Sequence, residues 1–295
     1  MDAVDDRRHE PGPEPGWREL VSVDFAAPDG RGGSLHIGVR PHEGTAWCWA
    51  YVVLPDGRPV AVRDESLAVP RPPGFAVRGD GLWAELFCET PWEHWSIGLE
   101  ALGVVLDDPR DAFAGERGEP IAVGFDLEWE ATTPPWPIEA GFLDDVDVGF
   151  EHAGVVHGEV LVGDDTWAFE GTGERVHRLG VEPERTDGWH RAALQLGEGL
   201  ALAFECDATG VASGYMWRAG EEQRPVRHVL VESHRDGVLP TAARYVVDAA
   251  LELDVEILGL APVPRPDGGR LVRGVCRYEA AEGEGTGWSE WYSAR

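Results

Sequence analysis

Residues 45–54 read TAWCWAYVVL, and this stretch decides the fold because its side chains alternate in size. Trp47, Trp49 and Tyr51 occupy odd-numbered positions, whereas small apolar residues occupy most of the even-numbered ones. A period of two residues is typical of a β-strand, whose side chains point alternately to its two faces. Residues 55–57 (PDG) then give a turn signal, after which an apolar run resumes. The segment therefore predicts a β-hairpin with both faces of its first strand buried.

The same alternation recurs along the chain, with glycine or proline between the segments. It is found at 81–90, 121–131, 154–162, 199–206, 226–233, 251–257 and 270–279. In residues 251–257 (LELDVEI) the apolar and acidic side chains alternate strictly, which excludes an amphipathic helix. Many short strands at regular spacing predict an all-β protein, built as an antiparallel barrel or sandwich.

The chain is expected to divide into two halves of similar length and strand content. Residues 1–16 (MDAVDDRRHEPGPEPG) are charged and rich in proline and glycine, which predicts a disordered arm. Prolines and acidic residues at 134–145 predict a linker, since proline cannot donate to a sheet ladder. We therefore expect one domain at 17–133 and a second at 146–295.

The composition restricts the class of partner. The 295 residues include 54 acidic side chains and 25 basic ones, all of them arginine, which gives a formal charge of −29. Such a surface repels phosphate backbones and anionic lipids, so we expect neither nucleic-acid binding nor membrane insertion. The four cysteines lie far apart, and the chain opens with no signal-peptide pattern. We expect reduced thiols, a cytoplasmic location and a monomer or homodimer.

Aromatic and acidic side chains gather in two neighbouring segments. Along residues 83–89, Trp83, Glu85 and Phe87 share one strand face, which is suited to line a cavity or the seam between the halves. The next segment, 89–95 (ETPWEHW), is the densest in chemistry, with Glu89, Glu93 and His94 between Trp92 and Trp95. A glutamate whose pKa is raised by apolar surroundings can transfer a proton near neutral pH. The alternative is that these acids are solvated and the aromatics cover an interdomain contact.

Metal and nucleotide cofactors are not expected. His152, His157 and Glu159 lack both the HExxH spacing and a convincing further ligand. The chain also has no GxGxxG after a strand, no GxxxxGK[ST] and no GxSxG. These absences disfavour nucleotide chemistry and serine hydrolysis, and we predict a metal-free protein without a cofactor.

Several motifs resemble those of the tandem lipocalin-like, or calycin, superfamily. The similar segments are GVRP at 38–41, WCWAY at 47–51, LPDGRPVAV at 54–62, GLWAE at 81–85, CETPWEHW at 88–95, DLEWEA at 126–131, HGEV at 157–160 and GWSEW at 287–291. This superfamily includes carotenoid 1,2-hydratase, AttH-like proteins, some natural-product cyclases and actinobacterial proteins of unknown function. The resemblance implies two lipocalin-like domains in tandem and a hydrophobic ligand.

One motif departs from the superfamily pattern. Where relatives carry a GxGxRDHSWG-like stretch, residues 171–180 read GTGERVHRLG. His177 persists, but Val176 and Leu179 replace the expected acid and tryptophan. The resemblance therefore implies a role for His177 in the chemistry of relatives, but the carboxylate that would orient it is missing from its expected place, so that chemistry is expected to be altered or lost here. Hydration of a carotenoid is not carried over.

Three hypotheses for function follow. The first is a cofactor-independent cyclase, isomerase or hydratase acting on a terpenoid or polyketide-like molecule, as in natural-product biosynthesis. Its proton-transfer candidates are Glu89, Glu93, His94 and His177, and its expected lining is Trp47, Trp49, Tyr51, Trp83, Glu85, Phe87, Trp92, Trp95 and Trp129. The second is a non-catalytic carrier of a hydrophobic metabolite, and the third is an interaction module whose aromatic residues form solid core.

Overall fold

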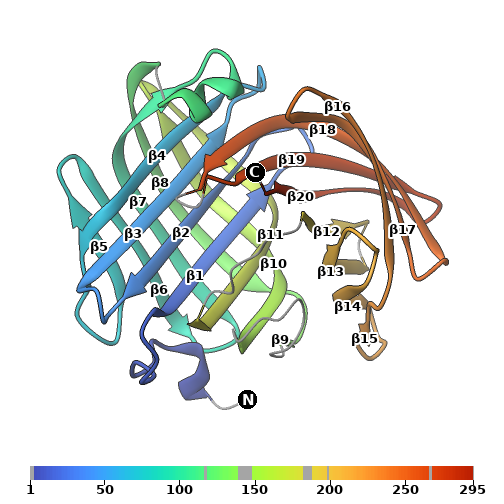
Figure 1. The fold of residues 1–295 in the computed structure, drawn as a ribbon, viewed down its shortest axis with the longest axis horizontal. Helices are drawn as coiled ribbons and strands as arrows, with labels where there is room; N and C mark the ends of the chain where they lie inside the picture. Colours follow the sequence, from blue (N-terminus) through green and yellow to red (C-terminus); the bar gives the residue numbers. More distant parts are fainter. Residues whose placement is uncertain are drawn as a thin grey trace.

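The computed structural model describes residues 3–115, 118–138, 148–181, 188–197, 199–265 and 268–294. Most of the described chain is β-strand, and its only helices are the two short 3-10 helices η1 (Ala3–Asp6) and η2 (Pro109–Ala114). The strands form two antiparallel sheets (Figure 1). The prediction of an all-β protein is confirmed. No helix in these ranges is both long enough and apolar enough to cross a membrane.

The first sheet has eleven strands and closes into a barrel. Its order is β4-β3-β2-β1-β11-β10-β8-β7-β6-β5, with β9 paired to β10. A short ladder between β4 and β7, in which Val60 lies opposite Val105, brings the two sides together. The strands are β1 (Trp17–Ala26), β2 (Gly32–Arg40), β3 (Thr45–Val53), β4 (Pro59–Ala68), β5 (Phe75–Gly79), β6 (Leu82–Thr90), β7 (His94–Val105), β8 (Glu119–Ala131), β9 (Trp136–Ile138), β10 (Val148–Val162) and β11 (Asp165–Val181).

The second sheet has nine strands and stays open, curving away from the barrel (Figure 1). Its order is β15-β14-β13-β12-β20-β19-β18-β17-β16. The strands are β12 (Trp189–Leu196), β13 (Leu200–Asp207), β14 (Ala212–Arg218), β15 (Arg224–Pro225), β16 (Val229–Asp236), β17 (Leu239–Val247), β18 (Leu251–Pro264), β19 (Arg270–Ala280) and β20 (Gly283–Ser293). Each sheet has its own buried apolar cluster. In each case the apolar side chains of the alternating strands lie on the face that covers this cluster.

A third cluster joins the two sheets at a seam. The even-numbered side chains of β3 face the core of the barrel, whereas Trp47, Trp49 and Tyr51 face outward and are buried with residues of the second sheet. Trp288 of β20 belongs to this cluster, and its indole N–H donates to the backbone oxygen of Phe25 in β1 at 2.9 Å. Both faces of β3 are therefore buried, as the sequence predicts, but each face has a different partner.

The change of sheet does not coincide with the linker predicted at 134–145. β9 pairs with β10, and residues 139–147 lie outside the described ranges. β10 and β11, which follow that segment, complete the first barrel, with β10 paired to β8 and β11 paired to β1. The chain passes to the second sheet only after β11. A division at 146 would cut the barrel, because long antiparallel ladders bind both strands to it.

The amino-terminal segment corrects a second expectation. Its described part, residues 3–16, is not a disordered arm, since it folds against the barrel. Asp6 is fully buried, and the His9 ring contacts Glu19 of β1. The segment is ordered because the buried carboxylate of Asp6 forms an ion pair with Arg175 of the barrel. The expectation of free thiols, by contrast, is confirmed for all four cysteines.

Candidate active site inside the first barrel

A polar cluster lies among aromatic rings at one end of the barrel interior. Arg175 and His177 alternate with outward-facing residues along β11, so both point inward. On the neighbouring strand β10, His152 lies opposite Arg175 and Phe150 lies opposite His177. Register alone therefore gathers a guanidinium and two imidazoles. All three are fully buried.

Two glycines make room for the aromatic wall. A Cβ atom at Gly154 would lie 2.5 Å from the indole nitrogen of Trp129, and one at Gly173 would lie 3.2 Å from the same ring. Trp95 lies opposite Trp129 on the adjacent strand β7, and both are buried. Gly173 of the 171–180 motif thus has a packing role, because a residue without a Cβ atom leaves room for the Trp129 ring against the sheet.

His177 has a carboxylate partner that its own motif lacks. Its Nε2 lies 2.8 Å from Oε1 of Glu19, on the adjacent strand β1. Glu19 also accepts from the His9 ring at 2.8 Å and from the His9 backbone N–H at 2.9 Å. The carboxylate is absent from its expected place in the motif, where Val176 stands, and Glu19 takes that position in space. It comes from a position 158 residues away, which no local motif reveals.

Burial and hydrogen bonding set the protonation of this pair. Burial alone would raise the pKa of Glu19, but the hydrogen bonds with His177 and His9 outweigh it and lower that pKa below its ordinary value. Burial lowers the pKa of His177, against the opposing effect of Glu19. An ionised Glu19 beside a neutral His177 requires Nε2–H to donate, which leaves the lone pair on Nδ1. Nδ1 has no hydrogen-bond partner among the described residues.

Arg175 supplies a fixed positive charge beside this pair. Its guanidinium carbon lies 4.6, 5.2 and 5.0 Å from the ring centres of Trp95, Trp129 and Phe150. Its Nε and Nη2 donate to Nε2 of His152 at 3.2 and 2.7 Å. Burial and the Arg175 charge hold the pKa of His152 well below its ordinary value, so His152 is a neutral acceptor. The site thus combines a cation, a neutral base and aromatic walls.

The structure divides the aromatic and acidic residues that the sequence singled out into three groups. Trp95 and Trp129 lie inside the barrel near His177, and the half-buried Trp92 contacts the ring of Phe150, with centres 4.6 Å apart. The second group, at the seam, consists of Trp47, Trp49 and Tyr51. The third group, on strand positions facing away from the barrel core, comprises Trp83, Glu85, Phe87, Glu89 and His94, together with the exposed turn residue Glu93.

The third group does not meet His177. Phe87 is 49 % exposed, and Glu89 accepts from Ser96 at the surface. His94 pairs with Glu128 at 2.7 Å, with about a third of each side chain exposed. The expectation of one pocket lined by all these residues is corrected, because alternation along β6 and β7 sends Glu85, Phe87 and Glu89 outward while Trp95 points inward.

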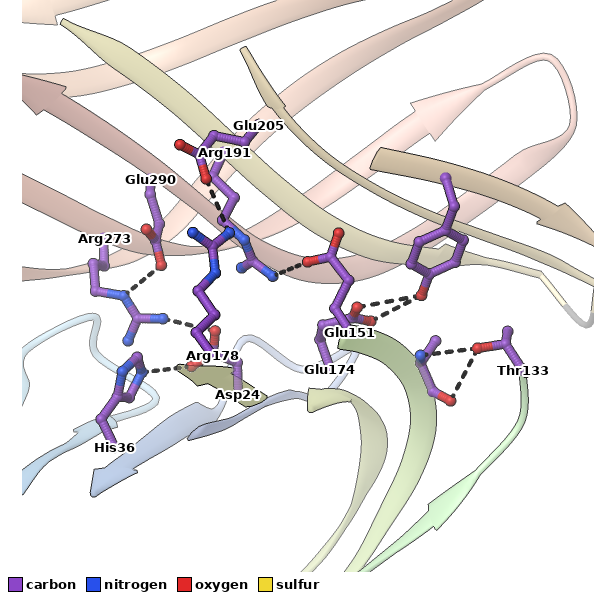
Figure 2. A network of polar contacts seen from close by, with 12 residues as sticks. Asp24, His36, Thr133, Glu151, Glu174, Arg178, Arg191, Glu205, Arg273 and Glu290 are labelled. Carbon is purple, nitrogen blue, oxygen red and sulfur yellow. Dashed lines mark hydrogen bonds and ion pairs between the residues drawn. The ribbon is translucent and has the colours of Figure 1, made fainter. Parts of the chain in front are cut away.

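Buried ion pairs cross the seam, and the sequence analysis did not anticipate them (Figure 2). Arg273 of β19 donates to Asp24 of β1 at 2.7 Å, to Glu290 of β20 at 2.9 Å and to Ser34 of β2 at 3.0 Å. Further along, Arg191 donates to Glu151 at 2.8 Å. These charges look like ordinary surface residues in the sequence, and only the packing of two sheets buries them.

Two hollows lie outside the barrel. An open groove of about 990 Å³ runs along the second sheet and is lined mostly by charged and polar side chains, among them Glu232, Arg244 and Glu256. A narrow crevice of about 10 Å³, room for roughly one water molecule, enters the seam between Asp24 and Glu174. Burial and the nearby Glu151 raise the pKa of Glu174 well above its ordinary value. Neither hollow has the aromatic lining that the sequence predicts.

One group of side chains has the composition of a metal site. The ligand atoms of His9, Glu19 and His177 lie within 4.8 Å of one another. In this arrangement both rings are hydrogen-bonded to the same carboxylate, and the Arg175 charge nearby opposes a cation. His177 Nδ1 also lacks, among the described residues, the acceptor that usually orients a metal-bound histidine. The geometry fits a hydrogen-bonded histidine–carboxylate pair better than a metal centre.

The barrel and the attached open sheet form a lipocalin-like fold, and the buried histidine–carboxylate pair is the candidate site inside its first barrel. The chain belongs to the family described as "Domain of unknown function (DUF7064)", whose sequence profile matches residues 2–295. A search of curated protein sequences gave no significant match.

Solved structures share this architecture along almost the whole chain. A putative AttH from Nitrosomonas europaea has a TM-score of 0.65 at 13% identity and covers 93% of this chain and 92% of its own. Kievitone hydratase from Nectria haematococca has a TM-score of 0.57 at 9% identity, covering 99% and 93%. CghA has a TM-score of 0.56 at 11% identity, covering 95% and 88%. At these identities the likeness shows that the fold is shared.

Proposed function

We propose that this protein is a cofactor-independent enzyme that uses His177 as a general base on a hydrophobic, terpenoid or polyketide-like molecule. The observation that carries the proposal is the neutral, buried imidazole, whose Nε2 is held by Glu19 at 2.8 Å while Nδ1 is unoccupied among the described residues. Glu19 is a positioning residue, since it orients the ring and stabilises the imidazolium that forms.

The chemistry is a proton relay that returns what it takes. Nδ1 of His177 removes a proton from an acidic C–H or O–H of the substrate, and the electron pair left behind moves into the substrate π-system. The imidazolium then returns the same proton to another atom, which completes an isomerisation or a cyclisation; in a hydration the base activates the incoming water. No redox partner is needed. Aromatic walls of Trp95 and Trp129 exclude water and shape the substrate.

The fold comparison supports the hydratase option. One of the structures with this architecture is titled kievitone hydratase, so the fold can house hydratase chemistry in that protein. For the present chain, the reaction class is proposed from the His177–Glu19 geometry.

Variants of the pair test the proposal. A panel of terpenoids and aromatic polyketides is incubated with the protein, and products are followed by liquid chromatography and mass spectrometry. His177→Asn should lower turnover by about 100-fold or more, the usual contribution of a general base. Glu19→Gln should lower kcat and shift its lower pH limit to lower pH, because Glu19 raises the pKa of His177. A purely structural role for Glu19 would not move that limit.

The matched control is the Glu89→Gln/Glu93→Gln double variant, which removes two exposed carboxylates and should keep full turnover. Equal activity of His177→Asn and the native protein would contradict the proposal. Binding of a panel compound, detected by tryptophan quenching, without turnover of any compound would replace it with the carrier hypothesis. Loss of turnover in the control but not in His177→Asn would return the chemistry to residues 89–95.

A further inference from the structure

The Asp6 carboxylate is held inside the barrel as a bound ligand would be. One of its oxygens lies 2.6 Å from Nη2 of Arg175. The other accepts from the backbone N–H of Trp92 at 2.6 Å and from the indole N–H of Trp95 at 3.2 Å. The thiol of Cys88 lies 3.9 Å from the same oxygen. Donors from the barrel thus converge on one carboxylate that the amino-terminal segment delivers.

The donors belong to the barrel and are placed by it. Arg175 lies on β11 and Trp95 on β7, and both are fully buried. Trp92 is the third residue of a tight turn, closed by the Glu93 N–H donating to the Thr90 oxygen, and this position accounts for its left-handed φ of 68°. The same turn presents the Trp92 N–H to Asp6.

More donors remain than Asp6 uses. Nη1 of Arg175 and Nε1 of Trp129 are buried and have no hydrogen-bond partner within the described ranges. An unsatisfied buried polar group is costly, so the free Nη1 of this guanidinium indicates a larger polar partner than a single carboxylate. The surrounding rings of Phe150, Trp95 and Trp129 would contact an apolar body.

The segment that carries Asp6 also covers the His177–Glu19 pair. His9, three residues further on, contacts the same Glu19 oxygen as His177, and the centres of the two imidazole rings lie 5.3 Å apart. Other side-chain contacts of the segment include Arg8 to the backbone oxygen of Pro70, and His42 to that of Gly12 at 2.8 Å. Its withdrawal would therefore free the anion-binding donors and the base together.

We propose that the donors around Asp6 form the head-group site for the substrate, which is a hydrophobic molecule bearing a carboxylate or enolate, and that Asp6 occupies this site as an intramolecular mimic of that anion. The inference rests on the proposed function, because it names the substrate class for the same site. Arg175 and His177 are two residues apart on one strand face, about 7 Å. The anionic group of the substrate would therefore bind at Arg175, about 7 Å along the strand from the group that His177 deprotonates.

Formate, the smallest carboxylate, is the first probe. Asp6→Ala removes the ion-pair partner of Arg175 and should lower the melting temperature. Added formate should restore part of the loss, relative to chloride at equal ionic strength, because a ligand that binds the native state stabilises it. Native protein and the exposed-site control Glu10→Ala should not respond. No rescue of Asp6→Ala, or equal rescue by chloride, would overturn the proposal.

Anthracene-9-carboxylate tests the apolar part of the ligand, with anthracene-9-carboxamide as its neutral counterpart. The carboxylate should bind Asp6→Ala about tenfold or more tightly than native protein, since a hydrogen bond to a buried charge contributes at least that factor. The carboxamide should gain far less, and the gain should vanish in Asp6→Ala/Arg175→Met. An equal gain for both probes would show that removal of Asp6 only opens apolar space, and would refute the anion site.

The two proposals fail separately. Carboxylate binding should survive in Asp6→Ala/His177→Asn, because His177 is not among the donors to Asp6. Binding there without turnover in any variant would leave the head-group site standing and reject the general base. Turnover that depends on His177 but is unaffected by Arg175→Met in a folded protein would do the reverse.

Discussion

Replacement of Arg273 by methionine should lower the free energy of unfolding by weakening the contact between the two sheets. Its guanidinium contacts Asp24, Glu290 and Ser34 at 2.7, 2.9 and 3.0 Å, and its side chain is 2% exposed. Arg273→Met fills a similar volume but leaves two carboxylates buried without their cation. Breaking a buried ion pair from one side costs about 3–5 kcal/mol. At about 2–4 °C per kcal/mol, the melting temperature should fall by about 10 °C.

Urea unfolding followed by circular dichroism measures this loss. The penalty arises from uncompensated charge, so the triple variant Arg273→Met/Asp24→Asn/Glu290→Gln should recover most of it. The pH dependence gives a second check. Burial alone would raise the pKa of Asp24, but Arg273 and His36 outweigh it and lower that pKa below its ordinary value of 3.8. The stability that Asp24 contributes is present above that value and is lost as pH falls through its native pKa, so the gap between native protein and Arg273→Met should narrow below about pH 4.

A loss below about 1 kcal/mol in Arg273→Met would refute the reasoning, because exposed pairs contribute that little. So would a triple variant no more stable than the single one, since the penalty would then come from packing.

Two further predictions concern buried positions. The pKa of Glu174 is raised by burial and by Glu151, so its protonated form favours the folded state, and stability falls as pH rises above the ordinary value of 4.5. Glu174→Gln should therefore gain on native protein between pH 5 and pH 8 in melting experiments, and a constant difference across that range would show that Glu174 is ionised. Gly154→Ala would place a Cβ atom 2.5 Å from the Trp129 ring and should cost about 1–3 kcal/mol with a changed near-ultraviolet spectrum; an unchanged spectrum and melting temperature would show that Trp129 moves freely.

The relation between sequence and site is clearest at His177. The glycine–histidine pattern of residues 171–180 places Arg175 and His177 on one face of a strand, because alternation is a local property. The partner Glu19 lies on β1, and strand pairing across 158 residues brings the two together. The motif predicts an acid next to His177 in the chain, at position 176, whereas the acid that pairs with it is Glu19 on the neighbouring strand.

The alternating strands, the turn after β3 and the two-faced burial of β3 were determined by the sequence alone, since a period of two residues and the backbone needs of turns act over a few positions. Only the tertiary structure decided which of those faces meets a core, a seam or solvent, because alternation separates two faces without naming what covers them. For the same reason Trp47 and Trp95 look alike in the sequence yet lie in different places, one at the seam and one in the barrel. Asp6 is the extreme case: a charged residue in a proline-rich segment looks solvated until a buried arginine provides its partner.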